Sequence, residues 1–388
     1  MDFSLSDEQQ MIIKSTRDFV INELYPHERE IEETGFLRED LHRELKAKAI
    51  EAGLYSANMP VEVGGGGLDT VAWVLYEKEL GRTSYALHFG CVGRPSNILL
   101  ACEGEQRDRY LLPTVRGDRV ECLAMTEPGA GSDLRGMKTT ATAAGDDFVI
   151  NGTKHFISHA DHSDFVILFA ATGEERTAQG VSRKKMTAFL IDMGHPGFKV
   201  RPGYKNVSHR GYTNSILEFN DCRVPKSAIL GELHRGFDVA NTWLGATRLQ
   251  VAATCLGRAE RALELATQWA VDRVQFGQQI GRFQGVSFKL ADMAVELRAA
   301  ELLVLEAAWK RDRKIDRDMD MAIAKVKATE MLAMVADEAL QIHGGMGLMS
   351  DLPLERIWRD ARIERIWDGT SEVQRHIISR GLLRPLGG

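Results

Sequence analysis

Asp368 stands where a carboxylate could act in acid–base chemistry. It opens the segment Asp-Gly-Thr-Ser, between two stretches with helical patterns. Ser371 and Gln374 are three residues apart and predict a capping box for the final helix, so Asp368 is expected on a loop at a helix mouth. A carboxylate there can be a general base, or it can bind the free N–H groups at the positive end of the helix dipole. Spacing alone favours this capping role.

A second segment that could bind a ligand reads Met125-Thr-Glu-Pro-Gly-Ala-Gly-Ser-Asp133. Its glycines leave backbone N–H groups open to a ligand, and Thr126 and Ser132 add two hydroxyl groups. The last glycine of a Gly-x-Gly-x-x-Gly pattern is missing, because Leu134 occupies that position, so any dinucleotide must bind outside a Rossmann unit. Taken alone, the segment is a glycine turn at the end of a strand.

Three further patterns point to no chemistry. Residues 155–162 hold three histidines and an aspartate, but their spacing fixes no fourth ligand, so we expect no metal site. The glycine run 64–67 is not followed by Gly-Lys-Ser/Thr and is expected to connect two helices. His343-Gly-Gly is similar to an oxyanion-hole motif, yet the chain has no Gly-x-Ser-x-Gly elbow, which argues against a serine hydrolase.

The elements that must position these residues change type along the chain. Residues 1–120 have helical periodicity, beginning with a capping box at Ser6 and Gln9. Helical stripes return from residue 231 to 388, where four long helices are enough for a bundle. The sequence therefore predicts an α+β protein in which a β domain is inserted between two helical ones.

The strands of this β domain are predicted between residues 121 and 230. Three apolar runs that look like strands lie at 165–171, 186–192 and 215–219. The pair Asn151-Gly152 is flanked by two further short runs and predicts a hairpin turn between them.

Composition excludes several classes of function. A formal net charge of −6 argues against nucleic-acid binding, which would need a basic patch for the phosphates. No apolar run is long enough to span a membrane and the N-terminus has no signal-peptide pattern, so we expect a cytoplasmic protein. The five cysteines are scattered and form no Cys-x-x-Cys pair, which argues against a disulfide framework or a zinc ribbon.

The segment from Gln341 to Arg375 resembles the C-terminal signature of the acyl-CoA dehydrogenase family. In that signature Gln-x-His/Leu-Gly-Gly-x-Gly leads through Arg-Asp-Ala-Arg-Ile to Tyr-Glu-Gly-Thr-Ser-Glu-Ile-Gln-Arg, and this chain has Trp367 and Asp368 in place of Tyr-Glu. The resemblance covers nearly the whole chain. It implies an N-terminal helical domain at 1–120, a middle β-barrel domain at 121–230, a C-terminal four-helix bundle at 231–388, and FAD as the cofactor.

Flavin contacts follow from the same resemblance. The segment that begins at Met125 is similar to the family's Thr-Glu-Pro-Gly-Ala-Gly-Ser-Asp signature, which implies that Met125 and Thr126 lie at the flavin ring and that Ser132 contacts flavin and acyl-CoA phosphate groups. Lys154-His-Phe-Ile-Ser158 is similar to Lys-x-Trp-Ile-Thr, which implies that Phe156 packs on the flavin and that Ser158 bonds near its N5. An alternating strand with Phe156 pointing inward would give the same pattern.

Other residues of the family pattern imply an oligomer, because they reach FAD bound to a neighbouring subunit. Arg273, Phe276 and Gln284 match this element, although read alone they are ordinary residues at a helix break. The resemblance therefore implies at least a dimer, and a homotetramer built as a dimer of dimers. The remaining residues that it assigns are Gln341, Gly345, Thr370 and Glu372 for the cofactor, and Ser132, Arg248 and Gly369 for the substrate.

The implied reaction is α,β-dehydrogenation of an acyl-CoA thioester, with electrons passed on to electron-transferring flavoprotein. Asp368 is at the position of the family's general base. Some relatives carry the base just before the arginine that matches Arg248, but this chain has Thr247 there. Aspartate is one methylene shorter than glutamate, about 1.5 Å. We therefore hypothesise that Asp368 serves a branched or alicyclic acyl-CoA whose α-carbon lies nearer the loop.

Two alternatives stay open at this point. A flavin oxidase of the nitroalkane oxidase type shares the fold and also uses an aspartate base, and it would consume oxygen without an added acceptor. A non-catalytic acyl-CoA-binding or flavoprotein-binding scaffold would hold FAD that no thioester bleaches. Retention of Ser132 and of Gly-Thr-Ser-Glu-Val-Gln-Arg after Asp368 favours the CoA thioester.

Overall fold

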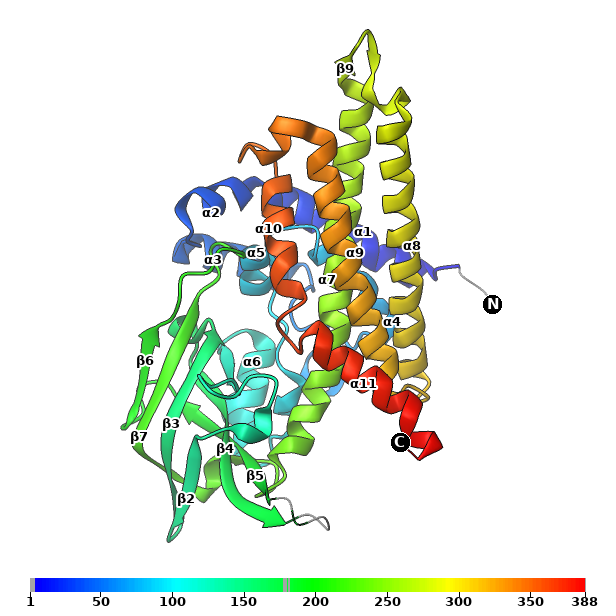
Figure 1. Ribbon diagram of the computed structural model, residues 1–388. Coiled ribbons are helices and arrows are strands. Elements are labelled where there is room, and N and C mark those ends of the chain that lie inside the picture. The colour runs from blue at the N-terminus through cyan, green and yellow to red at the C-terminus, as the bar shows by residue number, and fades with distance from the viewer. Residues whose placement is uncertain (1–3, 177–179, 181, 388) are drawn as a thin grey trace.

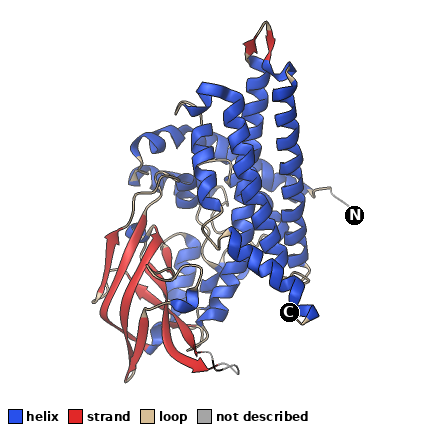
Figure 2. Ribbon diagram, in the orientation of Figure 1, coloured by secondary structure: helices blue, strands red, loops and turns tan. Residues whose placement is uncertain are grey.

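The computed structural model describes residues 4–176, 180 and 182–387. Helices, then strands, then helices follow one another along the chain, as the periodicity predicted (Figures 1 and 2). The Ser6–Gln9 capping box is present at the first helix. The N-terminal helices are α1 (Asp7–Phe19), α2 (Glu28–Thr34), α3 (Glu39–Glu51), α4 (Thr70–Leu80), α5 (Tyr85–Cys91) and α6 (Leu112–Arg116).

The middle of the chain forms one eight-stranded sheet in the order β6-β7-β3-β2-β4-β5-β8, with β1 parallel to β4. The three predicted runs at 165–171, 186–192 and 215–219 lie in β4, β5 and β7 and are confirmed as strands. The strands are β1 (Glu121–Ala124), β2 (Thr140–Ala144), β3 (Asp147–Ser158), β4 (Phe165–Arg176), β5 (Ser182–Asp192), β6 (Phe198–Pro202), β7 (Asn214–Pro225) and β8 (Ile229–Leu230).

The hairpin predicted at Asn151-Gly152 is wrong, because β3 runs straight through this pair. Its register against β7 shifts between Ile150 and Gly152, so the pair is a bulge. Gly152 has φ +151° and a Cβ there would lie 2.6 Å from the Cα of Thr139. Position 152 does require glycine, as the sequence pattern indicated. The reason is the close approach of the Thr139 backbone and not a turn.

The C-terminal helices form a bundle around α7 (Gly236–Asp272), which is 37 residues long. α8 (Gln284–Asp312) and α9 (Asp318–His343) run alongside it, and α10 (Leu354–Glu364) and α11 (Ser371–Leu383) pack on α9 (Figure 1). Between α7 and α8 the short strands β9 (Val274–Gln275) and β10 (Gln278–Gln279) make a hairpin that projects from one end of the molecule. No described helix is long and apolar enough to cross a membrane.

Buried apolar residues form separate cores for the helices and the sheet. The largest core joins α1, α3, α4 and α5 to α7, α8 and α9, so the two helical parts share one interior. A second core joins the 59–63 segment and the region before β1 to one face of the sheet, and a third lies on strands β2, β3, β4 and β7. All five cysteines are free and buried within these cores.

Candidate active site

The loop that carries Asp368 lies between α10 and α11. Its helix cap differs from the prediction, because Thr370 is the N-cap and its hydroxyl accepts a 3.2 Å bond from the N–H of Val373. Ser371 is already inside the helix, so the Ser371–Gln374 capping box is wrong by one residue. The amide of Gln374 instead donates to the carbonyl oxygen of Gly369 at 2.9 Å. Capping is therefore accomplished without the carboxylate of Asp368, which leaves that side chain free for another role.

Asp368 itself has a left-handed backbone, with φ +50°. Such a conformation is uncommon for a residue other than glycine and persists where surrounding contacts fix it. The hydroxyl of Thr247, on α7, lies close enough to the carboxylate to lower the pKa of Asp368 by hydrogen bonding. Burial raises the pKa of Asp368, while the nearby ammonium of Lys325 opposes that rise. A carboxylate with a raised pKa, held by a hydroxyl on a strained turn, has the properties of a general base.

Lys325, on α9, contacts the loop of Asp368 and was missed by sequence reasoning. It is 1% exposed, and its ammonium donates to the carbonyl oxygens of Trp367 and Gly369. The only local signal was a lysine inside an apolar stripe, at a position that the helical pattern assigns to the core. Its partners are more than forty residues away in sequence, so spacing alone could not identify them.

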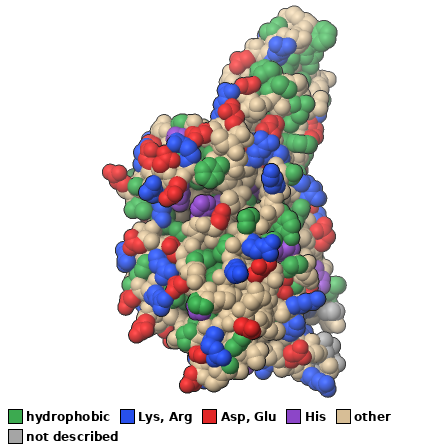
Figure 3. All heavy atoms as spheres, turned by 90° about the vertical axis from the view of Figure 1, so that its left-hand side faces the viewer, with side chains coloured by type: hydrophobic (Ala, Val, Ile, Leu, Met, Phe, Trp, Pro, Cys, Tyr) green, Lys and Arg blue, Asp and Glu red, His purple; other side chains and the backbone are tan. Residues whose placement is uncertain are grey.

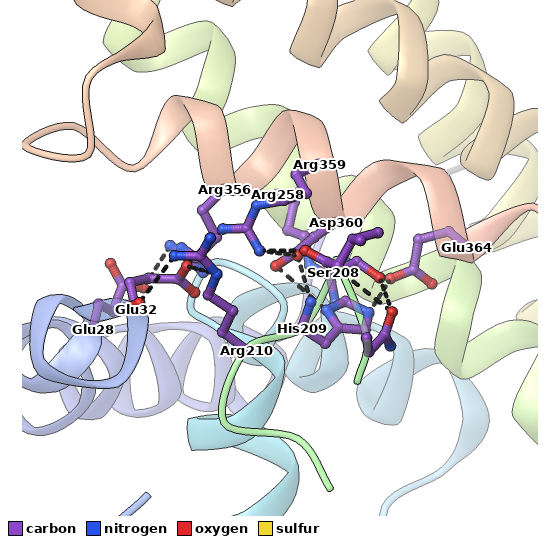
Figure 4. A network of polar contacts seen from close by, with 12 residues as sticks. Glu28, Glu32, Ser208, His209, Arg210, Arg258, Arg356, Arg359, Asp360 and Glu364 are labelled. Atoms are coloured by element: carbon purple, nitrogen blue, oxygen red, sulfur yellow. Dashed lines mark hydrogen bonds and ion pairs between the residues drawn. The ribbon is translucent and has the colours of Figure 1, made fainter. Parts of the chain in front are cut away.

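A buried network of charged residues supports the helix that leads into this loop (Figure 4). His209 lies 3.3 Å from Asp360 and 3.3 Å from Glu364, one turn apart on α10. Burial by itself would raise the pKa of Glu364, but Arg258 and His209 outweigh it and lower that pKa. The ionised Glu364 in turn accepts a 2.7 Å hydrogen bond from the indole of Trp367. The network thereby fixes the residue that precedes Asp368.

Glu28 extends this network to the N-terminal helices. It lies on α2 and binds Arg356 of α10 at 2.9 Å (Figure 4). It also binds Arg261 of α7 at 2.8 Å. Arg359 on α10 pairs with Glu32, also on α2, at 2.6 Å. Because His209 belongs to the segment between β6 and β7, all three parts of the chain meet at α10.

The glycine segment of the β domain is held by a second buried lysine. Lys154 is fully buried and donates to the carbonyl of Met125 at 2.9 Å and to Glu127 at 2.8 Å. The carbonyl of Thr126 accepts the N–H of His155 at 3.0 Å. Thr126 is partly exposed and Ser132 is exposed, while a Cβ at Gly129 or Gly131 would meet no atom within 4 Å. The segment therefore presents open backbone and two hydroxyls on a fixed base.

Phe156 does not point inward as an alternating strand would require. Its ring is 53% exposed and its backbone is left-handed, with φ +57°, at a second register shift in β3. The ring is 5.3 Å from that of Tyr204. An exposed aromatic ring on strained backbone is a platform for a planar ligand, so the inward alternative for Phe156 is wrong.

Tyr212 connects Ser158 to the residues around Asp368. The hydroxyls of Ser158 and Tyr212 are 2.7 Å apart. The Tyr212 ring contacts Tyr85 at 5.4 Å, and Tyr85 contacts Trp367 at 4.9 Å. Burial raises the pKa of Tyr212 to about 12, to which the negative charge of Asp368 also contributes. Both phenols are therefore neutral and can only donate or accept hydrogen bonds at neutral pH.

A cavity of about 160 Å³ opens beside Thr247. It lies between α4, the segment after α5, and α7, and two tryptophans, Trp73 and Trp243, form apolar walls. The other lining residues are Asn58, Leu68, Thr70, Arg94, Pro95, Ser96, Asn97, Ala246, Gln250 and Arg311. A larger groove of about 440 Å³ between α8 and α9 is lined mainly by charged side chains and contains none of the residues just described.

The expected substrate contact Arg248 lies next to Thr247 on α7. Its guanidinium is largely buried, burial lowers its pKa, and its Nε atom has no hydrogen-bond partner among the described residues. Asp318, 3.8 Å away, is its nearest carboxylate. Gly369 lies in the base loop, and Glu372 is exposed in the first turn of α11. These positions leave Arg248 with binding capacity for a polar ligand.

The residues expected to reach a neighbouring subunit lie at the far end of the bundle. Phe276 is 94% exposed at the tip of the β9–β10 hairpin, and Arg273 ends α7 beside it. Gln284 begins α8, while Gln341 and Gly345 lie exposed at the end of α9. Figure 3 shows the projecting end of the molecule with hydrophobic side chains on its surface. One chain does not bring these residues to Asp368.

Three domain families match the chain in succession. "Acyl-CoA dehydrogenase, N-terminal domain" matches residues 6–118, the middle domain matches 122–222, and the C-terminal domain matches 234–383. The chain is 36% identical to the human mitochondrial short-chain specific acyl-CoA dehydrogenase, over 98% of this chain and 91% of that one. It is also 36% identical to the caffeyl-CoA reductase–Etf complex subunit CarC of Acetobacterium woodii, over 98% of this chain and 99% of that one.

Solved structures agree with these matches. Butyryl-CoA dehydrogenase from Megasphaera elsdenii superposes with a TM-score of 0.89 at 34% identity, over 99% of this chain and 100% of that one. The chain therefore belongs to the acyl-CoA dehydrogenase family and is an FAD-dependent oxidoreductase. The exposed ring of Phe156 and the open glycine segment fit a flavin.

Proposed function

We propose that this enzyme dehydrogenates an acyl-CoA thioester between its α- and β-carbons, with Asp368 as the general base. The observation that carries the proposal is the series of contacts from Ser158 through Tyr212 and Tyr85 to Trp367, the residue before Asp368. It supports a single site that holds the carboxylate and the hydroxyl expected near flavin N5. A base and a hydride acceptor on the two sides of a Cα–Cβ bond are what this reaction needs.

Each group of the chain has a defined task in this mechanism. FAD, when bound, supplies the acceptor for the β-hydride. Asp368 accepts the α-proton, so its carboxylate must be ionised before the reaction and carries the proton afterwards. The backbone N–H of Asp368 is the expected donor to the thioester carbonyl, which acidifies the α-proton. Thr126, Phe156 and Ser158 would hold the flavin, and Arg248 with Ser132 would bind the CoA part.

The cavity beside Thr247 supports a short acyl group. Its volume of about 160 Å³ is well below the ~300–1,000 Å³ of sites for drug-sized ligands, and Trp73 and Trp243 are among its lining residues. A compact group fits such a space better than a long chain. We infer a short acyl chain, branched or alicyclic, whose α-carbon lies near the shorter aspartate.

The assembly and the electron acceptor follow from the outer surfaces. The exposed Phe276 and Arg273 would complete the cofactor site of a second copy, so we propose a homo-oligomer, a dimer of dimers. Electron-transferring flavoprotein is the proposed acceptor, because a relative that this chain matches over nearly its whole length is named as a subunit of an Etf complex.

The reverse reaction is a second candidate. The same relative is named for reduction of caffeyl-CoA, an unsaturated thioester. Run in that direction, Asp368 would give its proton to the α-carbon instead of accepting one. The residues and their places would be unchanged, so only the substrate that reacts distinguishes the two directions.

The experiment that tests the proposal is anaerobic mixing of the purified holoenzyme with a panel of thioesters. Short straight-chain, branched and alicyclic acyl-CoA compounds are each tested for bleaching of the flavin, with nitroalkanes alongside. Bleaching by a compact acyl-CoA is expected. Bleaching by nitroalkanes alone would move the protein to the oxidases, and a flavin that no compound bleaches would favour a non-catalytic binding role.

A further inference from the structure

Lys325 occupies an unusual position beneath the base loop. It lies on α9, is 1% exposed, and donates hydrogen bonds to the carbonyl oxygens of Trp367 and Gly369, the second at 2.6 Å. These carbonyls belong to the residues immediately before and after Asp368. Burying an ammonium is costly unless its charge is paired and its N–H groups are bonded. The base loop supplies the two hydrogen bonds, and the negative charges of Asp368 and Glu364 act on the ammonium.

The charged and titratable groups around Asp368 come from several elements. Lys325 on α9 and the hydroxyl of Thr247 on α7 lower the pKa of Asp368, whereas burial and Glu364 on α10 raise it. Tyr85 on α5 and Tyr212 before β7 also face the carboxylate, and burial raises the pKa of both phenols. Among the described residues that act on this pKa, Lys325 is the cation.

Other groups face Lys325 itself. Burial lowers the pKa of Lys325, and Asp368 and Glu364 oppose that effect. The thiol of Cys255 and the guanidinium of Arg248, both on α7, are the remaining groups, and burial raises the pKa of Cys255 well above its usual range. The ammonium is therefore bonded to two carbonyls, and the negative charges of two nearby carboxylates act on it.

We propose that Lys325 is a positioning residue for the catalytic carboxylate, because its ammonium ties together the two carbonyls that flank Asp368 and fixes the turn between them. The inference rests on the proposed role of Asp368 as base. The left-handed φ of +50° at Asp368 requires such support, since few residues other than glycine adopt it unaided. Fixing both neighbouring carbonyls fixes the backbone from which the short side chain of Asp368 extends.

Precise placement is important because aspartate has little reach to spare. A shift of about 1 Å in a reacting group can cost on the order of a hundredfold in rate. One buried donor that binds two carbonyls resists such a shift better than two separate flexible donors. The amide of Gln374, which donates to the carbonyl oxygen of Gly369 at 2.9 Å, supports only one side of the turn.

The test compares three variants of the holoenzyme. Lys325→Met removes the charge and both hydrogen bonds at similar length, and Lys325→Gln removes the charge but keeps a donor. Lys327→Met is the control, because Lys327 lies two residues further on α9 and pairs with Glu296 of α8. Flavin content and melting temperature establish that each variant is folded and loaded.

The first readout is the rate of anaerobic flavin reduction against pH. Loss of the positive charge raises the pKa of Asp368, and the base works only above that pKa. In Lys325→Met we expect the pH at which the rate falls on the acid side of the profile to rise by about one unit. At pH values above that point, the rate of flavin reduction should fall by about a hundredfold. Lys325→Gln should show the same shift with a smaller loss of rate. Lys327→Met should match the unmodified enzyme in both.

The second readout is amide hydrogen exchange of the peptide that covers residues 365–371, which does not depend on turnover. We expect faster exchange of this peptide in Lys325→Met, and unchanged exchange in Lys327→Met. A folded Lys325→Met or Lys325→Gln enzyme with an unmoved acid limb and unchanged exchange would overturn the inference. A slower rate without either change would also overturn it, since that result describes general weakening of the core.

The two proposals fail in different ways. If no thioester reduces the unmodified enzyme, the proposed function is contradicted, while the exchange measurement still decides whether Lys325 fixes the turn. If thioesters reduce the flavin, but the Lys325 variants change neither the amide exchange of residues 365–371 nor the pH dependence of the rate, only the role of Lys325 is contradicted.

Discussion

The hydroxyl groups of Ser158 and Tyr212 lie 2.7 Å apart at the junction of the β domain and the helical bundle. Ser158 ends β3, and Tyr212 comes from the segment before β7. The Tyr212 ring lies 5.4 Å from that of Tyr85, which is itself 4.9 Å from Trp367. This contact gives the β domain a defined place relative to the residue that precedes Asp368.

Tyr212→Phe tests the contribution of that hydrogen bond. Removing the phenol O–H leaves Ser158 without this partner, and a hydrogen bond contributes about 0.5–1.5 kcal/mol. We expect flavin reduction to slow by about three- to tenfold, measured by anaerobic stopped flow. Tyr110→Phe removes a phenol O–H outside the site and should leave the rate unchanged. Equal effects of the two substitutions would contradict the assignment.

Arg258→Leu tests whether the buried network in Figure 4 supports α10. Arg258 is 2% exposed and pairs with Glu364, so its loss leaves a buried carboxylate whose remaining partners are His209 and the neutral indole of Trp367. Breaking a buried pair from one side costs about 3–5 kcal/mol. Urea unfolding should show a loss of this size.

Arg29→Leu is the comparison, because Arg29 and Glu33 form an exposed pair. Its loss should change stability little, because water solvates both charges of an exposed pair. If the two substitutions shift the unfolding midpoint equally, the buried network does not have the proposed role.

Phe276→Asp tests the proposed role of the β9–β10 hairpin. The ring is 94% exposed in one chain, so a charge there should not lower the melting temperature of the subunit fold. We expect weaker assembly in size-exclusion chromatography and loss of bound FAD measured by its absorbance. Met11→Asp, at a site 66% exposed on α1, should change neither. Normal FAD content and assembly in Phe276→Asp would argue against a shared cofactor site.

Trp243→Ala tests whether the cavity beside Thr247 holds the acyl group. Removing the indole lengthens the cavity, so activity should extend to longer straight-chain thioesters. We expect the ratio of kcat/KM for a longer acyl-CoA to that for butyryl-CoA to rise about tenfold or more, since one methylene can be worth ~10–200-fold. Trp309→Ala, 44% exposed on α8, should leave the ratio unchanged. An unchanged ratio in both would place the acyl group elsewhere.

Sequence patterns predicted the structural features that are determined by residues close together in the chain. The Ser6–Gln9 capping box, the strands β4, β5 and β7, and the return to helix after the sheet were all visible as periodicity or spacing. Asn151-Gly152 misled because the same pair serves a turn and a bulge, and only the contact with Thr139 distinguishes them.

The parts that depend on distant contacts could not be predicted in this way. Lys325 reaches residues more than forty positions away, and His209 meets α10 from the segment between β6 and β7. A charged residue within an apolar stripe gives no indication in the sequence of which distant residue pairs with it. The family resemblance identified Asp368, but only the fold shows what holds it.

The measurement that tests the central claim most directly is anaerobic flavin reduction by a reactive thioester in Asp368→Asn. Asparagine keeps the shape of the side chain but cannot accept the α-proton, so we expect a loss of about a thousandfold. Burial raises the pKa of Asp368, so the ionised carboxylate lowers folded-state stability at neutral pH, and the variant should melt no earlier than the unmodified enzyme. A folded, FAD-loaded Asp368→Asn enzyme that keeps most of its reduction rate would show that Asp368 is not the base.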